Sequence, residues 1–160
     1  MSQSKNEQII VLSDLMHIRV APEETGHTYA VVEDIVPPLA GPPPHTHPDE
    51  EVFYIVEGEF EFILNDLANP MPAKAGSVIH VPSMALHTYR NVGNKPGKLL
   101  AILTPGDLVQ YFRAISSPVD PDNLPDLTQV PDFSKLDLTK VFALAPEHKV
   151  NFILPDVPQN

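Results

Sequence analysis

Two histidines and a glutamate are spaced so that they could bind a metal ion together. His45 and His47 lie one residue apart, at the end of the stretch Gly41-Pro-Pro-Pro-His-Thr-His47. On an extended strand, residues i and i+2 project from the same face about 6.6 Å apart, so both imidazoles can point to one place. If the chain turns at residues 48–50, Glu51 begins the next strand and can bring its carboxylate to that place. A fourth ligand would have to come from elsewhere in the chain.

Composition limits the kind of site and the kind of partner. The 160 residues include no cysteine, so disulfides and thiolate ligands are excluded and a metal must be held by nitrogen and oxygen atoms. Ten basic and twenty-one acidic side chains give a net charge of −11, which repels phosphate backbones and anionic membranes. We therefore expect neither nucleic acid nor a membrane as a partner. The polar N-terminus and the lack of a long apolar run predict a soluble, cytoplasmic protein.

The elements that must position these residues are predicted to be short β-strands. Apolar or alternating segments predict strands at 29–36, 52–56, 59–64, 78–81, 86–91 and 98–104. The nineteen prolines gather between such segments, at 37–48, 70–72, 118–131 and 146–158, and proline cannot donate to a sheet ladder. Strands at about 8–12-residue spacing favour an all-β sandwich or barrel over alternating strands and helices.

The C-terminal third has a different pattern. Residues 106–115 change to a helical period, and 134–148 form a second helix candidate with Ser134 or Asp137 as its N-cap. The segment 116–133 is too rich in proline for regular structure, so we expect an irregular arm there.

Two stretches of the chain resemble the paired sequence motifs of the cupins. The first stretch contains Gly41, His45, His47, Glu51 and Gly58, with the opening glycine one or two residues nearer the histidines than in the family pattern. The remaining positions of this motif match.

The second stretch contains Gly76, Pro82, His87 and Asn91 at the spacing of the second cupin motif. Met84 replaces the inner glycine of that motif, so we expect the turn to form without a residue that is free to adopt positive φ. The substitution removes no ligand. The wider match, from Thr25 through Phe112, covers nearly the whole expected barrel.

The resemblance implies an all-β fold, the cupin double-stranded β-helix or jelly-roll barrel, with short C-terminal helices. It divides the chain into an N-terminal arm (1–24), the cupin barrel (25–113), and a proline-rich arm with a C-terminal helix (114–160).

The resemblance also implies one divalent transition metal ion, Fe, Mn, Ni, Co, Cu or Zn, held by His45, His47, Glu51 and His87. Such ligands leave one or two coordination positions for water, substrate or oxygen. A lone His-x-His pair in a proline loop is more often exposed and idle, but the complete set at both spacings favours the metal site.

The closer resemblance is to single-domain cupins of the quercetin dioxygenase-like sort. It is carried by Pro-Pro-Pro-His-Thr-His, by Glu51 through Gly58, and by Leu103-Thr-Pro-Gly leading into an aromatic helix. It implies an oxidoreductase that brings O2 and a small aromatic or enolic substrate to the metal, with Glu51 as a catalytic base as well as a ligand.

Two other functions remain open, because the cupin fold hosts many chemistries. One is a non-oxidative metal-dependent isomerase or lyase, which would need polar pocket walls. The other is a module in which the metal only fixes a small ligand. Phe53, Ile55, Phe62 and Tyr89 are expected either to contact the substrate or to pack in the core. As pocket walls, these mostly apolar side chains favour a planar substrate.

Other features are predicted to serve structure. His17 and His148 are expected at the surface and His27 at a strand entrance, while His80 could pack beneath the barrel next to the ligands. The outward side chains Val52, Tyr54 and Val56 would form an apolar stripe, and we expect it to be buried against a second copy in a homodimer.

Overall fold

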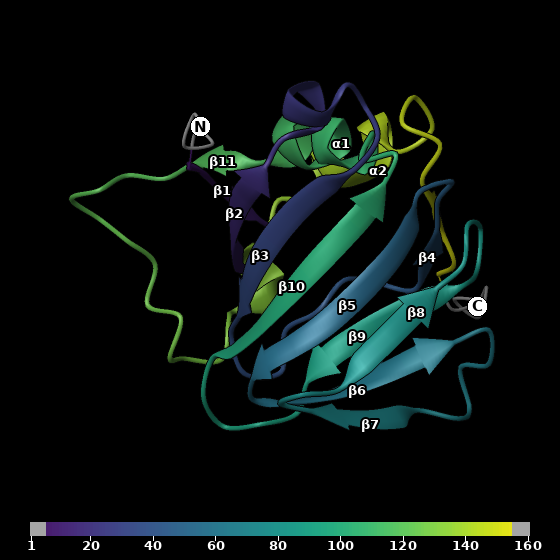
Figure 1. Cartoon of the computed structure of the whole chain (residues 1–160). Helices are drawn as coiled ribbons and strands as arrows, with labels where there is room; N and C mark the ends of the chain where they lie inside the picture. The colour runs from purple at the N-terminus through teal and green to yellow at the C-terminus, as the bar shows by residue number, and fades with distance from the viewer. Residues whose placement is uncertain (1–5, 155–160) are drawn as a thin grey trace, which may run out of the picture.

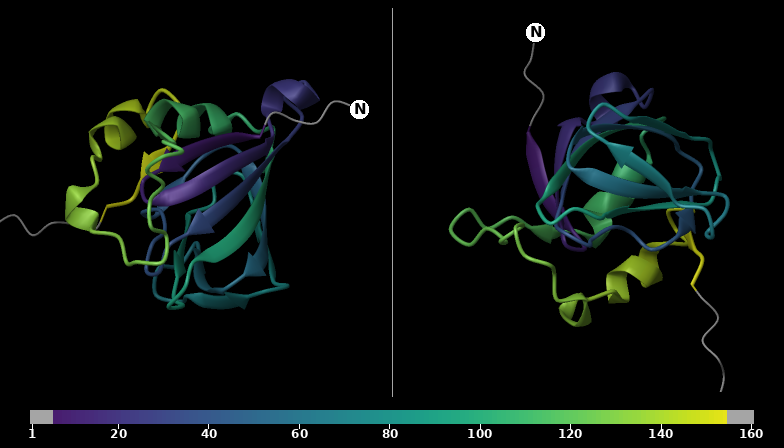
Figure 2. Two further views of the ribbon diagram at one scale, coloured as in Figure 1. Left: turned by 90° about the vertical axis from the view of Figure 1, so that its left-hand side faces the viewer. Right: turned by 90° about the horizontal axis from the view of Figure 1, so that it is seen from below.

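Two antiparallel β-sheets form the body of the molecule. The structure, a computed structural model of the chain, describes residues 6–154. The larger sheet has the strand order β11-β1-β2-β3-β10-β5-β8, and the smaller has the order β12-β4-β9-β6-β7. Seen from below (Figure 2, right), the sheets enclose a barrel, and the helices α1 and α2 lie at its upper end in Figure 1. This arrangement confirms the predicted jelly-roll barrel.

The elements have the following bounds. The strands are β1 (Glu7–Val11), β2 (Asp14–Val20), β3 (Ala30–Val36), β4 (His45–Thr46), β5 (Glu50–Glu57), β6 (Glu59–Leu64), β7 (Met71–Lys74), β8 (Val78–Val81), β9 (His87–Asn91), β10 (Gly97–Thr104), β11 (Ser117–Pro118) and β12 (Asn151–Phe152). The helices are η1 (Pro22–Thr25), α1 (Leu108–Ile115), η2 (Phe133–Lys135) and α2 (Thr139–Leu144). None of these helices is long and apolar enough to cross a membrane.

Alternation of buried and less buried residues shows which side chains of each central strand point into the barrel. In β5, Glu51, Phe53 and Ile55 are buried while Tyr54 and Val56 are exposed. Residues two apart on a strand share a face, so the strand that carries Glu51 also supplies two core side chains. The predicted inward face of this strand is confirmed.

The N-terminal segment, predicted to be an arm, is part of the larger sheet. Strands β1 and β2 form a hairpin, and β2 pairs with β3 along five registered positions. Ile9 and Val11 on β1 and Met16 and Ile18 on β2 are buried in one core cluster. Their burial stabilises the hairpin, at roughly 25 cal/mol for each Å² of apolar surface removed from water. The sheet therefore extends well before residue 25.

The C-terminal third follows the prediction only in part. The helix expected within 106–115 is present as α1, and residues 119–132 form no helix or strand. The long helix expected over 134–148 is instead the short η2 and the six-residue α2. Asp132 caps η2 by accepting a hydrogen bond from the Ser134 backbone N–H, so the aspartate rather than Ser134 starts the first turn.

Backbone geometry explains two positions of the cupin-like motifs. A Cβ atom on Gly41 would lie 1.9 Å from the backbone oxygen of Tyr89, so only glycine lets the segment before β4 approach β9 this closely. At the position of the missing inner glycine, Met84 itself adopts a φ of 63°, contrary to the prediction for that turn. A left-handed conformation costs a residue with a side chain about 1–2 kcal/mol. The Met84 side chain is about half exposed.

Candidate metal centre

Strand pairing brings the predicted ligands together from three parts of the chain. His45 lies on β4 and His87 on β9, and the two residues are direct partners in the antiparallel register. His47 follows β4 in the loop that leads to β5, and Glu51 is the second residue of β5. One nitrogen from each of the three histidines lies within 4.8 Å of those of the other two. The three histidines are therefore grouped as in a metal site.

Glu51 completes the group from the side of the larger sheet. Its Oε2 lies 3.0 Å from Nε2 of His87 and 3.2 Å from Nε2 of His47. The carboxylate is 4% exposed. The structure thus groups the three histidines and places Glu51 against two of them, His47 and His87, and the role of all four residues as ligands stays a prediction.

Backbone carbonyls orient two of the imidazoles. Nδ1 of His45 lies 2.8 Å from the Pro43 oxygen, and Nδ1 of His87 lies 2.9 Å from the Ala85 oxygen. Donation from Nδ1–H to these oxygens leaves the Nε2 lone pair of each ring free to bind a metal.

His47 is also suited to bind a metal, because its buried ring nitrogens have no hydrogen-bond partner among the described residues. It is 1% exposed, yet neither ring nitrogen makes a hydrogen bond to any described residue, because the contact from Nε2 to Glu51 lacks hydrogen-bonding geometry. A buried polar atom without a partner costs about 1–3 kcal/mol. A divalent cation bound to Nε2 would remove that cost, so the residues present fit a metal ion.

The protonation states also fit metal binding. Burial, helped by the neighbouring His87 and His47, lowers the pKa of His45 to about 3, so this ring is neutral at pH 7. Burial alone would raise the pKa of Glu51, but the close His47 and His87 rings outweigh this and hold the pKa at about 2. Burial opposes protonation of His47, but the Glu51 carboxylate outweighs it and raises the pKa of His47. A metal that binds this ring must compete with its protonation.

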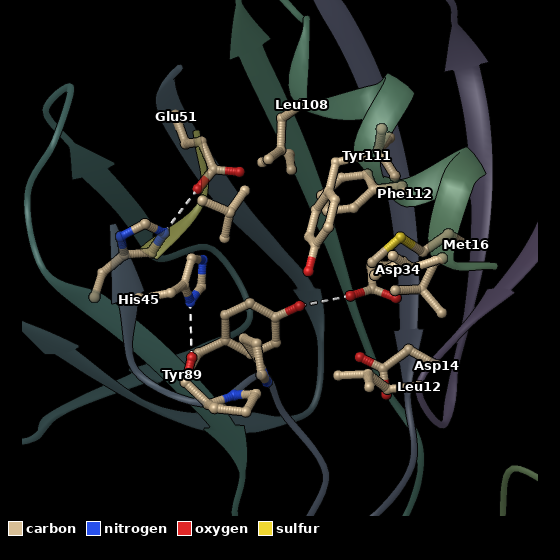
Figure 3. Close-up of a pocket in the computed structure, with 18 of the residues that line it drawn as sticks. Leu12, Asp14, Met16, Asp34, His45, Glu51, Tyr89, Leu108, Tyr111 and Phe112 are labelled. Carbon is tan, nitrogen blue, oxygen red and sulfur yellow. Dashed lines mark hydrogen bonds and ion pairs between the residues drawn. The ribbon is translucent and has the colours of Figure 1, made fainter. Parts of the chain in front are cut away.

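A cavity of about 70 Å³ adjoins the centre. His45, Glu51 and His87 line one part of its wall, and Leu108, Tyr111 and Phe112 of α1 cover it (Figure 3). Most of the remaining wall is apolar, so a molecule bound beside the metal would be shielded from water.

Two of the four predicted substrate contacts lie at this cavity. Phe53 and Tyr89 line it. Ile55 and Phe62 are fully buried in the second core cluster, where Phe62 packs against Phe53 and Tyr89, and they do not line the cavity. Their inward direction was predicted correctly, but their depth in the barrel was not.

Three buried aspartates near the cavity were missed by the sequence analysis. Asp14 and Asp34 line the wall away from the ligands, and Asp49 accepts hydrogen bonds from the backbone N–H groups of Gly106 and Leu108 at the start of α1. A signal for Asp34 was present, because it falls on the buried face of β3 in an otherwise apolar alternation.

Two other histidines differ from the expectation. His80 does not pack beneath the barrel: its side chain is about half exposed and binds Glu50 on the outer face, because Val81 takes the inward position of β8. His17, expected at the surface, is 9% exposed and lies 3.2 Å from the Gln8 amide nitrogen. Asn91 of the second motif is buried, and its side chain bonds the backbone at Val36, Gly93 and Lys95, so it serves the fold.

Comparison with known proteins is consistent with this geometry. Residues 32–110 match the family model described as a cupin domain. No curated protein matches the chain at significant sequence similarity.

Several solved structures resemble the chain. A predicted oxalate decarboxylase from Thermotoga maritima is 27% identical, with a TM-score of 0.53 over 57% of this chain and 79% of that one. An RmlC-like cupin from Shewanella frigidimarina is 20% identical, with a TM-score of 0.54 over 66% of this chain and 88% of that one. A variant of oxalate decarboxylase from Bacillus subtilis is 17% identical, with a TM-score of 0.59 over 70% of this chain and 30% of that one. Residues 32–110 thus match a cupin domain, and the solved structures resemble the chain in fold.

Proposed function

We propose that this protein is a metal-dependent oxidoreductase, a dioxygenase that acts on a small enolic substrate. The observation that carries the proposal is a group of three imidazoles beside a covered, mostly apolar cavity, with His45, His87 and the ionised carboxylate of Glu51 on the cavity wall. A divalent metal ion held there would act as Lewis acid and template for substrate and O2. The motif resemblance to quercetin dioxygenase-like cupins supports the same reaction class.

Glu51 is the residue that would handle the proton. Its low pKa keeps it ionised at neutral pH, and it lies at the cavity wall next to His87. A substrate hydroxyl placed beside it would give its proton to the carboxylate, which increases the electron density of the enol for attack by oxygen. Leu108 and Phe53 line the same cavity and would keep bulk water away.

The cavity size narrows the substrate class. A cavity of about 150 Å³ is known to hold one benzene molecule. The cavity here is about 70 Å³, so a three-ring flavonol does not fit unless the covering helices move. The proposed substrate is therefore a compact enol or enediol with few heavy atoms.

The proposal is tested by oxygen consumption. The protein is stripped of metal, reloaded separately with Fe, Mn, Ni, Co, Cu and Zn, and assayed with small 1,3-diketones and enediols in an oxygen electrode. We expect at least one metal to give oxygen uptake equal to substrate loss, with both atoms of ¹⁸O2 in the products. His87→Ala should reduce the rate at least 100-fold, whereas His80→Ala, which changes an exposed histidine outside the centre, should not. No oxygen uptake with any metal would refute the proposal.

A non-oxidative lyase or isomerase is the second candidate. The observation in its favour is the polar wall formed by Asp14, Asp34 and Tyr89, since such an enzyme needs polar contacts with its substrate. Oxalate itself is a poor candidate despite the resemblance to a predicted oxalate decarboxylase. No Lys or Arg is among the described residues that line the cavity, and a dianion would face two aspartates. Turnover of small hydroxy or oxo compounds under nitrogen would favour this candidate, and saturable binding without turnover would favour a ligand-binding module.

A further inference from the structure

Two buried aspartates face the cavity on the side away from the metal centre. Asp14 on β2 and Asp34 on β3 are 4% and 2% exposed. Asp34 pairs with Met16, so Asp14 is its diagonal neighbour across the two strands. The Tyr89 hydroxyl, which comes from the opposite sheet, donates to Asp34 Oδ2 at 2.7 Å (Figure 3).

The two carboxyls have no cationic partner among the described residues. No ion pair among the described residues includes either residue. Their polar contacts are the Tyr89 hydroxyl on Asp34, the Ser13 hydroxyl on Asp14 at 3.2 Å, and a hydrogen bond between the two carboxyls. Two carboxylates this close cannot both be ionised in an apolar environment. Burial raises the pKa of Asp34 to about 7, and burial together with the charge of Asp34 raises the pKa of Asp14 well above its ordinary value. At neutral pH the pair therefore carries at most one negative charge.

One carboxyl oxygen of this pair is unused. Asp34 Oδ1 is buried, belongs to a residue that lines the cavity, and has no hydrogen-bond partner among the described residues. Leaving a buried acceptor unpaired costs about 1–3 kcal/mol. A donor that enters the cavity would recover that free energy, so this oxygen is a ready binding point for a ligand.

We propose that Asp34 Oδ1 accepts a hydrogen bond from an uncharged hydroxyl group of the substrate, at the end of the molecule away from the metal. The inference deepens the proposed function and rests on it for the other end of the ligand, an oxygen that binds the metal. The wall between the two ends includes Phe53, Leu99 and Ala101, so the middle of the ligand is apolar. The substrate class is a short hydroxy compound with oxygen functions at both ends.

The surroundings of Asp34 favour a neutral donor over a charged group. An ammonium group would lose its hydration beside Met16 and Val32, and the protonated pair offers at most one negative charge in return. An anionic group would be repelled by that charge. An uncharged hydroxyl can donate a hydrogen bond, and it avoids both the dehydration cost of an ammonium group and the repulsion of an anion.

The test compares ligands that share a carboxylate and differ only at the far end. Glycolate, 3-hydroxypropanoate and 4-hydroxybutanoate are each paired with the acid that has a methyl group in place of the hydroxyl, and with the acid that has an ammonium group. Affinities for the zinc-loaded protein are measured by calorimetry, so that neither turnover nor oxygen is needed. At one chain length or more, we expect the hydroxy acid to bind at least 5-fold more tightly than its methyl and ammonium counterparts.

Substitution of Asp34 tests whether this carboxyl causes the tighter binding of the hydroxy acids. In Asp34→Asn, the amide oxygen can still accept from Tyr89, which leaves an NH2 donor in place of Oδ1. The variant should bind the hydroxy acid and the methyl acid about equally tightly, while its affinity for the methyl acid stays the same as that of wild type. Glu33→Gln is the matched control, because Glu33 is the neighbour of Asp34 on the other face of β3, where it binds Arg19. It should keep the full preference.

The outcomes separate this inference from the proposed function. If zinc-loaded protein binds the acids with no hydroxyl preference at any length, binds none of them, or prefers the ammonium acids, the hydroxyl subsite is wrong. A preference that persists in Asp34→Asn also refutes it. If the preference is present but no metal supports oxygen uptake, the subsite stands and the dioxygenase proposal fails.

Discussion

Asp49 and Leu108 are joined by a hydrogen bond of 3.2 Å between the carboxylate oxygen Oδ2 and the backbone N–H, across 59 positions of the sequence. The same oxygen accepts from the Gly106 N–H at 3.0 Å. Asp49 lies between the predicted ligands His47 and Glu51, so one buried side chain connects the loop before β5 to the helix that covers the cavity.

Replacement of Asp49 should therefore weaken the fold. Asp49→Ala leaves two buried backbone N–H groups without acceptors, and each costs about 1–3 kcal/mol. We expect the free energy of unfolding to fall by about 2–4 kcal/mol in urea denaturation of the metal-free protein. Asp107→Ala is the control, because Asp107 precedes α1 directly but makes no side-chain cap. A loss below about 1 kcal/mol for Asp49→Ala would contradict this role.

Metal binding should stabilise the folded chain. A ligand that binds only the folded state at 100 times its Kd adds about 2.7 kcal/mol. We expect Zn²⁺ or Mn²⁺ to raise the melting temperature of metal-free protein, with the gain lost in His87→Ala and reduced in Glu51→Gln. The readouts are thermal unfolding and metal content after dialysis. An equal gain in wild type and His87→Ala would show that the metal binds elsewhere.

The buried pair Asp14 and Asp34 should make stability fall as pH rises toward neutrality. The pKa of Asp34 is about 7 in the folded protein against 3.8 ordinarily, so between about pH 4 and 7 the folded state holds a proton that the unfolded state has released. The free energy of unfolding therefore decreases across that window, by about 1.4 kcal/mol for each unit of raised pKa.

Asp34→Asn tests this dependence. The variant cannot ionise at this position. Its free energy of unfolding, compared with that of wild type, should therefore rise by about 1 kcal/mol or more between pH 5 and pH 8 in the absence of metal. Denaturant unfolding across that range provides the measurement, and Glu33→Gln serves as the control on the other face of β3. Parallel curves for wild type and Asp34→Asn would mean that the pair is not held protonated.

The outer face of β5 and β8 is the basis of the dimer proposal. Tyr54, Val56 and Val78 are 45%, 44% and 63% exposed, and Tyr54 and Val78 are direct partners across the two strands. No described segment covers them. We propose that this face packs against a second copy of the chain, because burial of large apolar side chains is favourable.

Sedimentation at micromolar concentration can test the dimer. Tyr54→Glu combined with Val78→Glu should convert a wild-type dimer into a monomer that keeps its melting temperature. Leu67→Glu replaces an equally exposed apolar side chain in the connection between β6 and β7 and should leave the dimer intact. A monomeric wild-type protein would rule the proposal out.

The resemblance to the two cupin motifs predicted that His45, His47 and His87 lie together, and the structure shows this grouping. The inward face of β5 follows from strand periodicity. Periodicity fixes the face of a side chain but not its height in a barrel, which depends on the register between strands. For that reason the sequence did not indicate that Ile55 and Phe62, predicted to face inward, lie away from the cavity wall.

The other differences between the sequence predictions and the structure also have specific causes. The strands β1 and β2 carry polar residues such as Gln8 and Arg19 on one face, and their short alternations were not recognised as a hairpin. Asp34 is buried because it lies on the inward face of β3, and Tyr89 and Asp14 meet its carboxyl from other strands. No local pattern in the sequence predicts that meeting.

The pairing of β12 with β4 has a consequence for how the site forms during synthesis. Asn151 and Phe152 are registered against Thr46 and His45, so the strand that carries the first histidine has its outer neighbour supplied by residues about a hundred positions later. Until those residues leave the ribosome, β4 is an open sheet edge and the nascent barrel has an unfinished side next to the ligands. Final closure of the metal centre therefore waits for the last part of the described chain.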